Sequence, residues 1–259
     1  MDLKVSMEST TTRWKGKGFA EIARSNPMSQ TLDQLQQALT QQPKTRALLS
    51  GQSALLEATP AQADLLNRAC LGRPIVTAEK DKQWFELGLE EALYLHHHMK
   101  CLPIVCENEN PMNDDVLWAR MKSVTKRFPV LYKAYSHLRS KRWVVRSGSQ
   151  YGADFVVYRH HPALVHSEYA AIVRSPGCNS TRGGDARLES WPDLQCALRV
   201  CGSVAKMLLV LNVDSKGCMA EEERFPACLE EYTVEECVIK RWTPEKCREG
   251  SQTVGTNEN

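Results

Sequence analysis

Three polar side chains in the second half of the chain have the types that proton transfer and anion stabilisation need. Tyr158 ends an alternating apolar run, His166 follows eight residues later, and Lys206 stands where an expected helix meets an expected strand. An imidazole titrates near neutral pH and suits an acid or a base, whereas an ammonium group stabilises negative charge. Their spacing alone leaves ordinary roles open: a packed strand tyrosine, a structural histidine and a lysine that caps a helix.

Several common catalytic signatures are absent from the sequence. It contains no GxxxxGK[ST], no GxGxxG after a strand, no GxSxG and no HExxH. Their absence argues against P-loop nucleotide hydrolysis and against dehydrogenase, α/β-hydrolase and zinc-protease functions. His96, His97 and His98 are adjacent, so on a regular helix they point about 100° apart and cannot share one metal ion. We expect them at a partly exposed helix end.

The ten cysteines show neither a disulfide framework nor a zinc pattern. There is no CxxC pair, and the closest pairs, Cys101 with Cys106 and Cys196 with Cys201, are five residues apart. Disulfide scaffolds contain more than about 8–10% cysteine, well above the share in this chain. We therefore expect buried free thiols in a reducing compartment. A cysteine-based redox or zinc protein stays an alternative that thiol blocking or EDTA would test.

The length of the chain allows one large or two small domains, and its charge distribution indicates one basic and one acidic surface. The chain has 259 residues and a net charge of +2, which does not suggest a generally basic or acidic protein. The charges are nevertheless segregated. Residues 119–160 contain ten Lys or Arg and one acid, whereas residues 214–237 contain eight acids and two basic residues. The first stretch is suited to a polyanion, and the second, which includes Glu221–Glu223, is expected to face a basic partner.

The hydrophobic pattern predicts a helix-rich first half and a second half with more strands. Apolar residues at helical spacing predict helices at 31–42, 59–71 and 79–101, and a short strand follows at 102–106. Asn113–Asp115 caps another helix, and Pro129 begins the next one. One helix and four β-rich runs come after it: strands 143–147, 153–158, 168–174 and 207–213 and helix 191–204.

We therefore expect an α/β (α+β) fold with two domains. The small helix-rich N-terminal domain spans 31–125 and is followed by a mixed-sheet α/β domain at 126–249. Residues 1–30 are polar and lack a clear period, so we expect a flexible N-terminus there. Residues 250–259 are equally polar, and we expect a disordered tail.

Four stretches are similar, in order, to a known family. GADFVVYRHHPALVHSEY (152–169) and ALRVCGSVAKMLLVL (197–211) carry the three candidate residues. YKAYSHLRSKRWVVRSGSQYG (132–152) precedes them, and EEALYLHHHMKCLPI (90–104) lies in the first half. Together they resemble the tRNA-splicing intron endonucleases over about residues 84–243. The resemblance implies an N-terminal domain of the intron endonuclease type, followed by a restriction-endonuclease-like catalytic domain.

The resemblance also implies a site and a reaction. The family's catalytic tyrosine, histidine and lysine fall on Tyr158, His166 and Lys206. The preceding turn departs from the family's Gly-Pro-Pro pattern, because residues 160–163 read His-His-Pro-Ala, and this affects loop contacts rather than the three side chains. RNA supplies its own nucleophile, the 2′-OH, so cleavage needs a base, an acid and a cation, and no metal or cofactor. The expected products carry a 2′,3′-cyclic phosphate and a 5′-OH.

The three side chains are expected to divide this chemistry. His166 suits the acid that protonates the leaving 5′-oxygen, and Lys206 suits the cation beside the charged transition state. Tyr158 is the awkward member, because a phenol titrates near pH 10. It acts as a base only if its pKa is depressed; otherwise it orients the 2′-OH.

Four further residues are expected to bind RNA. Arg199 and Trp242 match the family positions at which an Arg and a Trp, or a second Arg, stack on a flipped bulge base, a contact worth about 1–3 kcal/mol per base. A packed Trp242 and a surface Arg199 stay open as structural alternatives. Arg142 and Arg146 lie in the basic stretch and are expected to hold phosphates, although part of that stretch fits a solvated helix face.

The family member that this chain most resembles is the eukaryotic catalytic subunit that cuts the 5′ splice site. That resemblance implies a tRNA-intron lyase acting on intron-containing precursor tRNA. It also implies a nuclear heterotetramer with a second catalytic subunit and two structural subunits, and no membrane. Two alternatives remain: the subunit that cuts the 3′ splice site, and a non-catalytic RNA-binding or scaffold subunit, against which the intact Tyr158, His166 and Lys206 argue.

Overall fold

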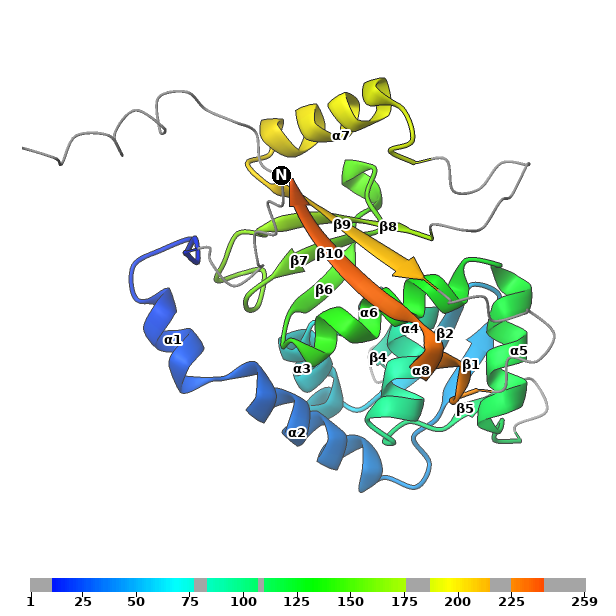
Figure 1. Cartoon of the computed structure of the whole chain (residues 1–259). Helices are drawn as coiled ribbons and strands as arrows, with labels where there is room; N and C mark the ends of the chain where they lie inside the picture. Colours follow the sequence, from blue (N-terminus) through cyan, green and yellow to red (C-terminus); the bar gives the residue numbers. More distant parts are fainter. Residues whose placement is uncertain (1–10, 77–82, 107–109, 176–186, 215–224, 240–259) are drawn as a thin grey trace, which may run out of the picture.

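The computed structural model describes residues 11–76, 83–106, 110–175, 187–214 and 225–239. These residues form two five-stranded sheets with helices packed around them (Figure 1). The first sheet is built from the N-terminal half of the chain and the second from the C-terminal half. This mixed α/β architecture, an N-terminal domain followed by a mixed-sheet domain, confirms the expected fold class. None of the described helices is both long and apolar enough to cross a membrane.

The N-terminal sheet has the strand order β3-β4-β2-β1-β5, and only the β1–β5 pair is parallel. Helices α2 (Met28–Thr40) and α3 (Pro60–Ala69) pack against each other, with Leu35, Leu39 and Leu66 fully buried. The five strands are β1 (Ala47–Ser50), β2 (Ser53–Ala58), β3 (Arg73–Ile75), β4 (Gln83–Gly88) and β5 (Ile104–Val105). Strands β1–β3 lie between the expected helices, in stretches where the sequence pattern predicts no element, so this half is less helix-rich than expected.

The helix expected over residues 79–101 is wrong at its start. The described part begins with β4, continues as α4 (Leu89–Leu93) and ends in the π-helical turn Tyr94–His98. In β4, Phe85 and Leu87 are buried and alternate with less buried neighbours, which is the period of a strand. The helical spacing in this stretch arises because the apolar residues of a strand and of a helix follow each other without a gap.

The C-terminal sheet has the order β10-β9-β8-β7-β6, in which only β8 and β9 run parallel. Alternate residues of β8 face opposite layers: Tyr169 and Ala171 join the core shared with α6 (Phe128–Ser140), and Ala170 and Ile172 pack towards α7 (Trp191–Ser203). Figure 1 shows these two helices on opposite sides of the sheet. The strands are β6 (Val144–Ser147), β7 (Phe155–Tyr158), β8 (Tyr169–Arg174), β9 (Met207–Asp214) and β10 (Thr233–Ile239).

One continuous apolar core joins the two halves. It runs from the N-terminal leucines through α5 (Asp114–Val124) and α6 to β8 and β9. Trp118, Phe128 and Tyr132 are buried within it. The Phe128 ring stacks on Tyr132 at a centroid distance of 5.9 Å and is tilted against Trp118 at 5.4 Å. The boundary expected at residue 125 falls in the short link between α5 and α6. The two halves therefore support each other across this link.

The described part of the expected flexible N-terminus contains structure that its polar sequence does not predict. Helix α1 (Phe19–Ser25) lies there, and α2 begins at Met28 rather than at residue 31. The expected tail at 250–259 and the acidic Glu221–Glu223 lie outside the described residues. All seven described cysteines are free thiols, as expected. Cys70, Cys101, Cys201 and Cys228 are buried, whereas Cys196 and Cys237 are exposed, so the expectation of buried thiols holds only in part.

Candidate active site

The three candidate catalytic residues come from the ends of three neighbouring strands. Tyr158 is the last residue of β7, His166 precedes β8, and Lys206 comes immediately before β9. Because β7 is antiparallel to β8 and β8 is parallel to β9, the end of β7 and the starts of β8 and β9 meet at one edge. Glu168 connects them: its N–H donates to the Val157 carbonyl (2.9 Å), and its carbonyl accepts the Met207 N–H (2.9 Å). The fold thus gathers residues that lie up to 48 positions apart in the sequence.

Tyr158 is half-buried, and its surroundings favour the neutral phenol. Burial is the main cause that raises the pKa of Tyr158 above its ordinary value, and the nearby Tyr151 raises it further. A hydrogen bond with the Ser167 side chain and the charge of Arg146 act in the opposite direction, but they are smaller effects. A phenolate base needs a depressed pKa, whereas the surroundings of Tyr158 raise its pKa. The neutral phenol is therefore available as a hydrogen-bond donor.

Tyr151 is a site residue that sequence reasoning missed. It ends the 3₁₀ turn Ser149–Tyr151 between β6 and β7, and the Lys206 Nζ lies 4.1 Å from the centroid of its ring. A cation at this distance over an aromatic face is attracted by the ring quadrupole. Tyr151 therefore contacts Lys206 and acts electrostatically on Tyr158. The only sequence signal was its place in the GSQYG segment that leads into β7.

The loop between β7 and β8 carries three histidines, and the structure distinguishes them. The ring nitrogens Nε2 of His160 and His161 lie 2.9 Å from the Asn26 carbonyl and 3.2 Å from the Asn67 carbonyl. Both rings therefore attach the loop to distant backbone. The side chain of His166 is exposed at the same edge as Tyr158 and Lys206. Of the three, His166 is the histidine whose ring is presented to solvent at the site.

An ion pair closes the base of this loop. The Arg159 Nε donates to the Glu168 Oε1 at 2.9 Å, and the Glu168 side chain is buried. The Arg159 guanidinium also lies 4.5 Å from the ring centroid of Trp143. Breaking this ion pair would leave the buried Glu168 carboxylate without its partner, which is costly. The pair therefore joins the two ends of the loop, at Arg159 and Glu168.

A cavity of about 550 Å³ opens beside Tyr158 at the junction of the two domains. Arg73 and Pro74 of the N-terminal domain line it, together with Arg146, Tyr151 and Tyr158 of the second domain. Its lining is rich in hydrogen-bond donors and contains two arginines, which suits an anionic ligand with polar groups. The tyrosine with the candidate catalytic role thus faces a space that both domains form.

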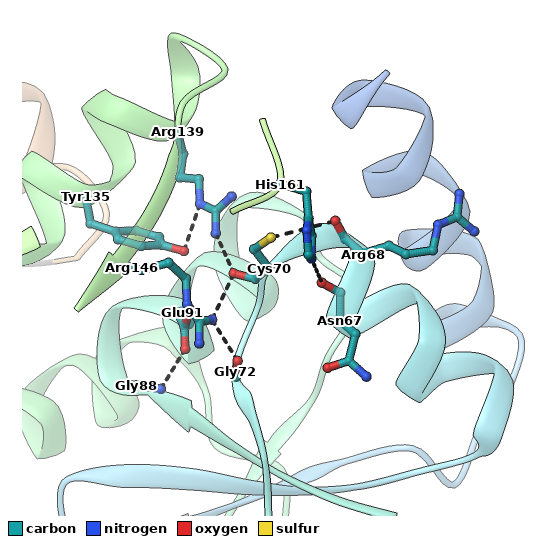
Figure 2. A network of polar contacts seen from close by, with 10 residues as sticks. All are labelled: Asn67, Arg68, Cys70, Gly72, Gly88, Glu91, Tyr135, Arg139, Arg146 and His161. Carbon is teal, nitrogen blue, oxygen red and sulfur yellow. Dashed lines mark hydrogen bonds and ion pairs between the residues drawn. The ribbon is translucent and has the colours of Figure 1, made fainter. Parts of the chain in front are cut away.

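Arg146 also joins the two domains (Figure 2). Its Nη1 donates to the Gly72 carbonyl at 2.7 Å and to the Cys70 carbonyl at 3.1 Å, and it lies 3.6 Å from the Glu91 carboxylate. The buried Arg139 reaches the Cys70 carbonyl as well, at 3.3 Å. Two arginines of the second domain therefore bind the same turn of the first. The expectation that Arg146 contacts RNA stays a prediction beside this structural role.

The other predicted RNA-binding residues lie on exposed surface or outside the described residues. Arg142 is exposed at a positive φ of 65° after α6, two residues before Val144, which pairs with Tyr158. It thus lies at the Tyr158 end of the sheet. Arg199 is exposed on α7, and Trp242 lies outside the described residues. The stacking of a base between these last two residues stays a prediction.

The three adjacent histidines do not diverge as a regular helix predicts. His96 Nε2 and His97 Nδ1 each lie 3.0 Å from an oxygen of Asp114, because the turn that carries them is π-helical. His98 instead stacks on Tyr94 at a centroid distance of 4.8 Å. In the part of the chain that the structure describes, no three His, Cys, Asp or Glu side chains form a metal-binding group.

Two protein-family models match the chain. The model of the tRNA intron endonuclease catalytic C-terminal domain matches residues 128–220, and the model of the tRNA intron endonuclease N-terminal domain matches residues 45–118. Both matches agree with the two domains of the structure. Tyr158, His166 and Lys206 all lie within the catalytic match.

Individual relatives carry names from the same family. The chain is 51% identical over 239 residues to the tRNA-splicing endonuclease subunit Sen2-1 of Arabidopsis thaliana, which covers 92% of this chain and 97% of that protein. It is 47% identical over 250 residues to a probable tRNA-splicing endonuclease subunit Sen2 of Oryza sativa subsp. japonica. That match covers 94% of this chain and 84% of the rice protein. The subunit Sen2 of Mus musculus is 34% identical over 167 residues, covering 64% of this chain and 36% of the mouse protein.

Proposed function

Because this chain belongs to the Sen2 family of tRNA-splicing endonuclease subunits, we propose that it cuts precursor tRNA at the 5′ splice site. It contains the catalytic domain of this endoribonuclease family, and the family acts on precursor tRNA. One observation carries the proposal: the strand pairing gathers Tyr158, His166 and Lys206 at one edge of the catalytic sheet. The sequence motifs around these residues support the 5′ site over the 3′ site.

The proposed reaction is metal-independent attack of a ribose 2′-OH on the adjacent phosphate. Tyr158 donates a hydrogen bond that orients the 2′-OH, a role that its raised pKa supports. As the 2′-oxygen attacks phosphorus, its proton passes to solvent water and the bond from phosphorus to the 5′-oxygen breaks. His166, whose side chain is exposed at this edge, protonates the leaving 5′-oxygen. Lys206, placed against the Tyr151 ring, stabilises the extra negative charge of the transition state. The products carry a 2′,3′-cyclic phosphate and a 5′-OH.

The proposed RNA path crosses the Tyr158 edge of the sheet. Arg142 is exposed there, and Arg146 lines the adjoining cavity, so both can approach phosphates. Arg199 of α7 and Trp242 are assigned to an unpaired base, because bulges and loops expose the base edges that an A-form helix hides. The assignments of Arg142, Arg146 and Arg199 rest on the position of each residue and on the resemblance of the motifs around it. The assignment of Trp242 rests on the resemblance alone.

The chain is proposed to work inside a nuclear heterotetramer. Its partners are a second catalytic subunit and two structural subunits, and its substrate is intron-containing precursor tRNA. The support for this assembly is membership in the family. Co-purification of a tagged chain with three other subunits, and its recovery in nuclear fractions, would test the assembly and the localisation separately.

The decisive experiment reconstitutes the complex and maps the cuts on a precursor tRNA. We expect His166→Ala to lower the rate of cleavage at the 5′ splice site by about a hundredfold to ten-thousandfold, while the 3′ cut persists. The wild-type products should carry 2′,3′-cyclic phosphate and 5′-OH ends. His98→Ala is a matched control, since this exposed histidine lies in the N-terminal domain. Selective loss of the 3′ cut would assign the chain to the other splice site. Wild-type cleavage by His166→Ala would support the non-catalytic alternative.

A further inference from the structure

A short N-terminal segment pairs with the loop that carries His166. The His166 N–H donates to the Arg13 carbonyl at 3.0 Å, and the Lys15 N–H donates to the Leu164 carbonyl at 2.9 Å. Between these bonds, Trp14 and Val165 form an antiparallel bridge. Residues 13–15 therefore add a strand-like edge to the loop, although about 150 positions separate the two segments. We call residues 13–15 the N-terminal strap.

The strap also reaches the residue that follows His166. The Arg13 Nη2 donates to the Ser167 carbonyl at 2.7 Å, a distance typical of a hydrogen bond from a charged donor. The Ser167 side chain in turn makes a hydrogen bond with Tyr158. Arg13 therefore holds the backbone on both sides of His166, through its own carbonyl before the histidine and through its guanidinium after it. A loop side chain keeps one orientation only if the backbone that carries it is held in place, so these contacts help to orient His166.

The contacts of the strap concentrate on this loop. Val165, the partner of Trp14, is fully buried and anchors the centre of the pairing. Arg13, Trp14 and Lys15 are themselves exposed, so the strap lies on the outside of the loop rather than in the core. Both family models begin after it, at residues 45 and 128. The strap is thus an addition to the two matched domains, and it touches the loop of the proposed acid.

We propose that Arg13 is a positioning residue for His166 and that the strap fixes the loop in its cleavage-competent form. The inference rests on the proposed role of His166 as the acid. Displacing a reacting group by about 1 Å can cost about a hundredfold in rate. Loss of the Arg13 guanidinium is therefore expected to lower kcat without a comparable effect on KM.

The first test compares two arginines of the same N-terminal region. In the reconstituted complex, with precursor tRNA as substrate, Arg13→Ala should lower kcat for the proposed 5′ cut by between about tenfold and a hundredfold. KM and the thermal unfolding midpoint should stay close to wild type, since Arg13 is exposed. Arg24→Ala is the control, because this residue is exposed on α1 and pairs only with the exposed Glu21 in the described structure. Unchanged kcat in Arg13→Ala would overturn the proposal.

A second pair of variants tests the backbone contact of the strap. Lys15→Pro removes the N–H that donates to Leu164, whereas Lys15→Ala removes the side chain and keeps that N–H. We expect Lys15→Pro to lower kcat as Arg13→Ala does and Lys15→Ala to behave as wild type. Equal activity of the two Lys15 variants would mean that the pairing does not position the loop.

A double-mutant cycle separates positioning from general support. If Arg13 acts through His166, Arg13→Ala should reduce the residual single-turnover rate of His166→Ala by less than about twofold. The same fold reduction in both backgrounds would assign Arg13 a role unrelated to His166 and would overturn the inference. If His166→Ala itself cut at the wild-type rate, the proposed function would fail first. An active wild type, a strongly impaired His166→Ala and an unaffected Arg13→Ala would refute the proposed role of the strap and leave the proposed function standing.

Discussion

Replacing Tyr158 by Phe decides between the two roles open to this phenol. Burial raises the pKa of Tyr158 above its ordinary value, so the neutral phenol predominates at neutral pH. Even at the ordinary value near 10, only about one phenol in a thousand is ionised at pH 7. A base role would depend on this small fraction, whereas a hydrogen-bond donor is present in every molecule. We therefore expect Tyr158 to orient the 2′-OH.

The two roles predict different losses of rate. Loss of one neutral hydrogen bond costs about 0.5–1.5 kcal/mol, which corresponds to about a 2- to 13-fold fall in kcat. Loss of a general base costs about a hundredfold to ten-thousandfold. For Tyr158→Phe we expect the smaller fall and a pH profile parallel to wild type between pH 6 and pH 9.5. The measurement is single-turnover cleavage of precursor tRNA by the reconstituted complex.

Ser167→Ala provides the matched control. It removes the side-chain hydrogen bond to Tyr158 and keeps the phenol; because that bond lowers the pKa of Tyr158, its removal raises the pKa further. With a donor phenol, the profile of Ser167→Ala should not shift along the pH axis. A wild-type rate that rises tenfold per pH unit towards pH 10, together with a shift of the Ser167→Ala profile to higher pH, would refute the donor role.

Three further predictions concern other contacts of the structure. Tyr151→Leu should lower kcat about two- to fivefold in the same cleavage assay, because a cation–π contact of about 0.5–1 kcal/mol with Lys206 is lost, and Tyr151→Phe should restore the rate. Gly148→Ala places a Cβ 2.8 Å from the Phe155 carbonyl carbon and should lower the free energy of unfolding by about 1–3 kcal/mol in denaturant titration. Gly202→Ala, with open space at the same atom on α7, should not lower it. Arg146→Ala should reduce the salt dependence of RNA binding by about one unit of slope if Arg146 contacts a phosphate, and an unchanged slope would leave it only the domain contact.

The local pattern of the sequence determines much of the second domain. The β-rich runs that end at Tyr158 and begin at Met207 are strands, and helix α7 lies within two residues of its expected bounds. Each of these elements depends on neighbours within a few positions, such as Ser190, whose hydroxyl accepts the Asp193 N–H at the start of α7. The catalytic residue types also follow from the sequence, through motifs that resemble a family.

Hydrophobic periodicity does not identify the strands in two segments of the chain. Trp84, Leu87 and Leu95 have helical spacing, yet Gln83–Gly88 is a strand, because pairing with β2 and β3 decides the conformation of so short an apolar run. Strand β10 in the second half is likewise not predicted. Glu235 and Glu236 interrupt its apolar alternation, although the strand pairs along its whole length with β9. In both places hydrogen bonds to distant strands outweigh the local preference.

The site itself was decided by long-range backbone pairing. Parallel pairing of β8 with β9 brings Lys206 to the edge where Tyr158 and His166 lie, and no local pattern specifies which strand lies beside which. The contact of Tyr151 with Lys206 and the pairing of Arg13 with His166 have the same origin, because each joins positions far apart in the chain. The sequence by itself determined which chemical groups this protein carries and which segments hold them. Only the tertiary structure decided which groups meet, since hydrogen bonds between distant strands, and the burial that accompanies them, form only when the whole sheet is assembled.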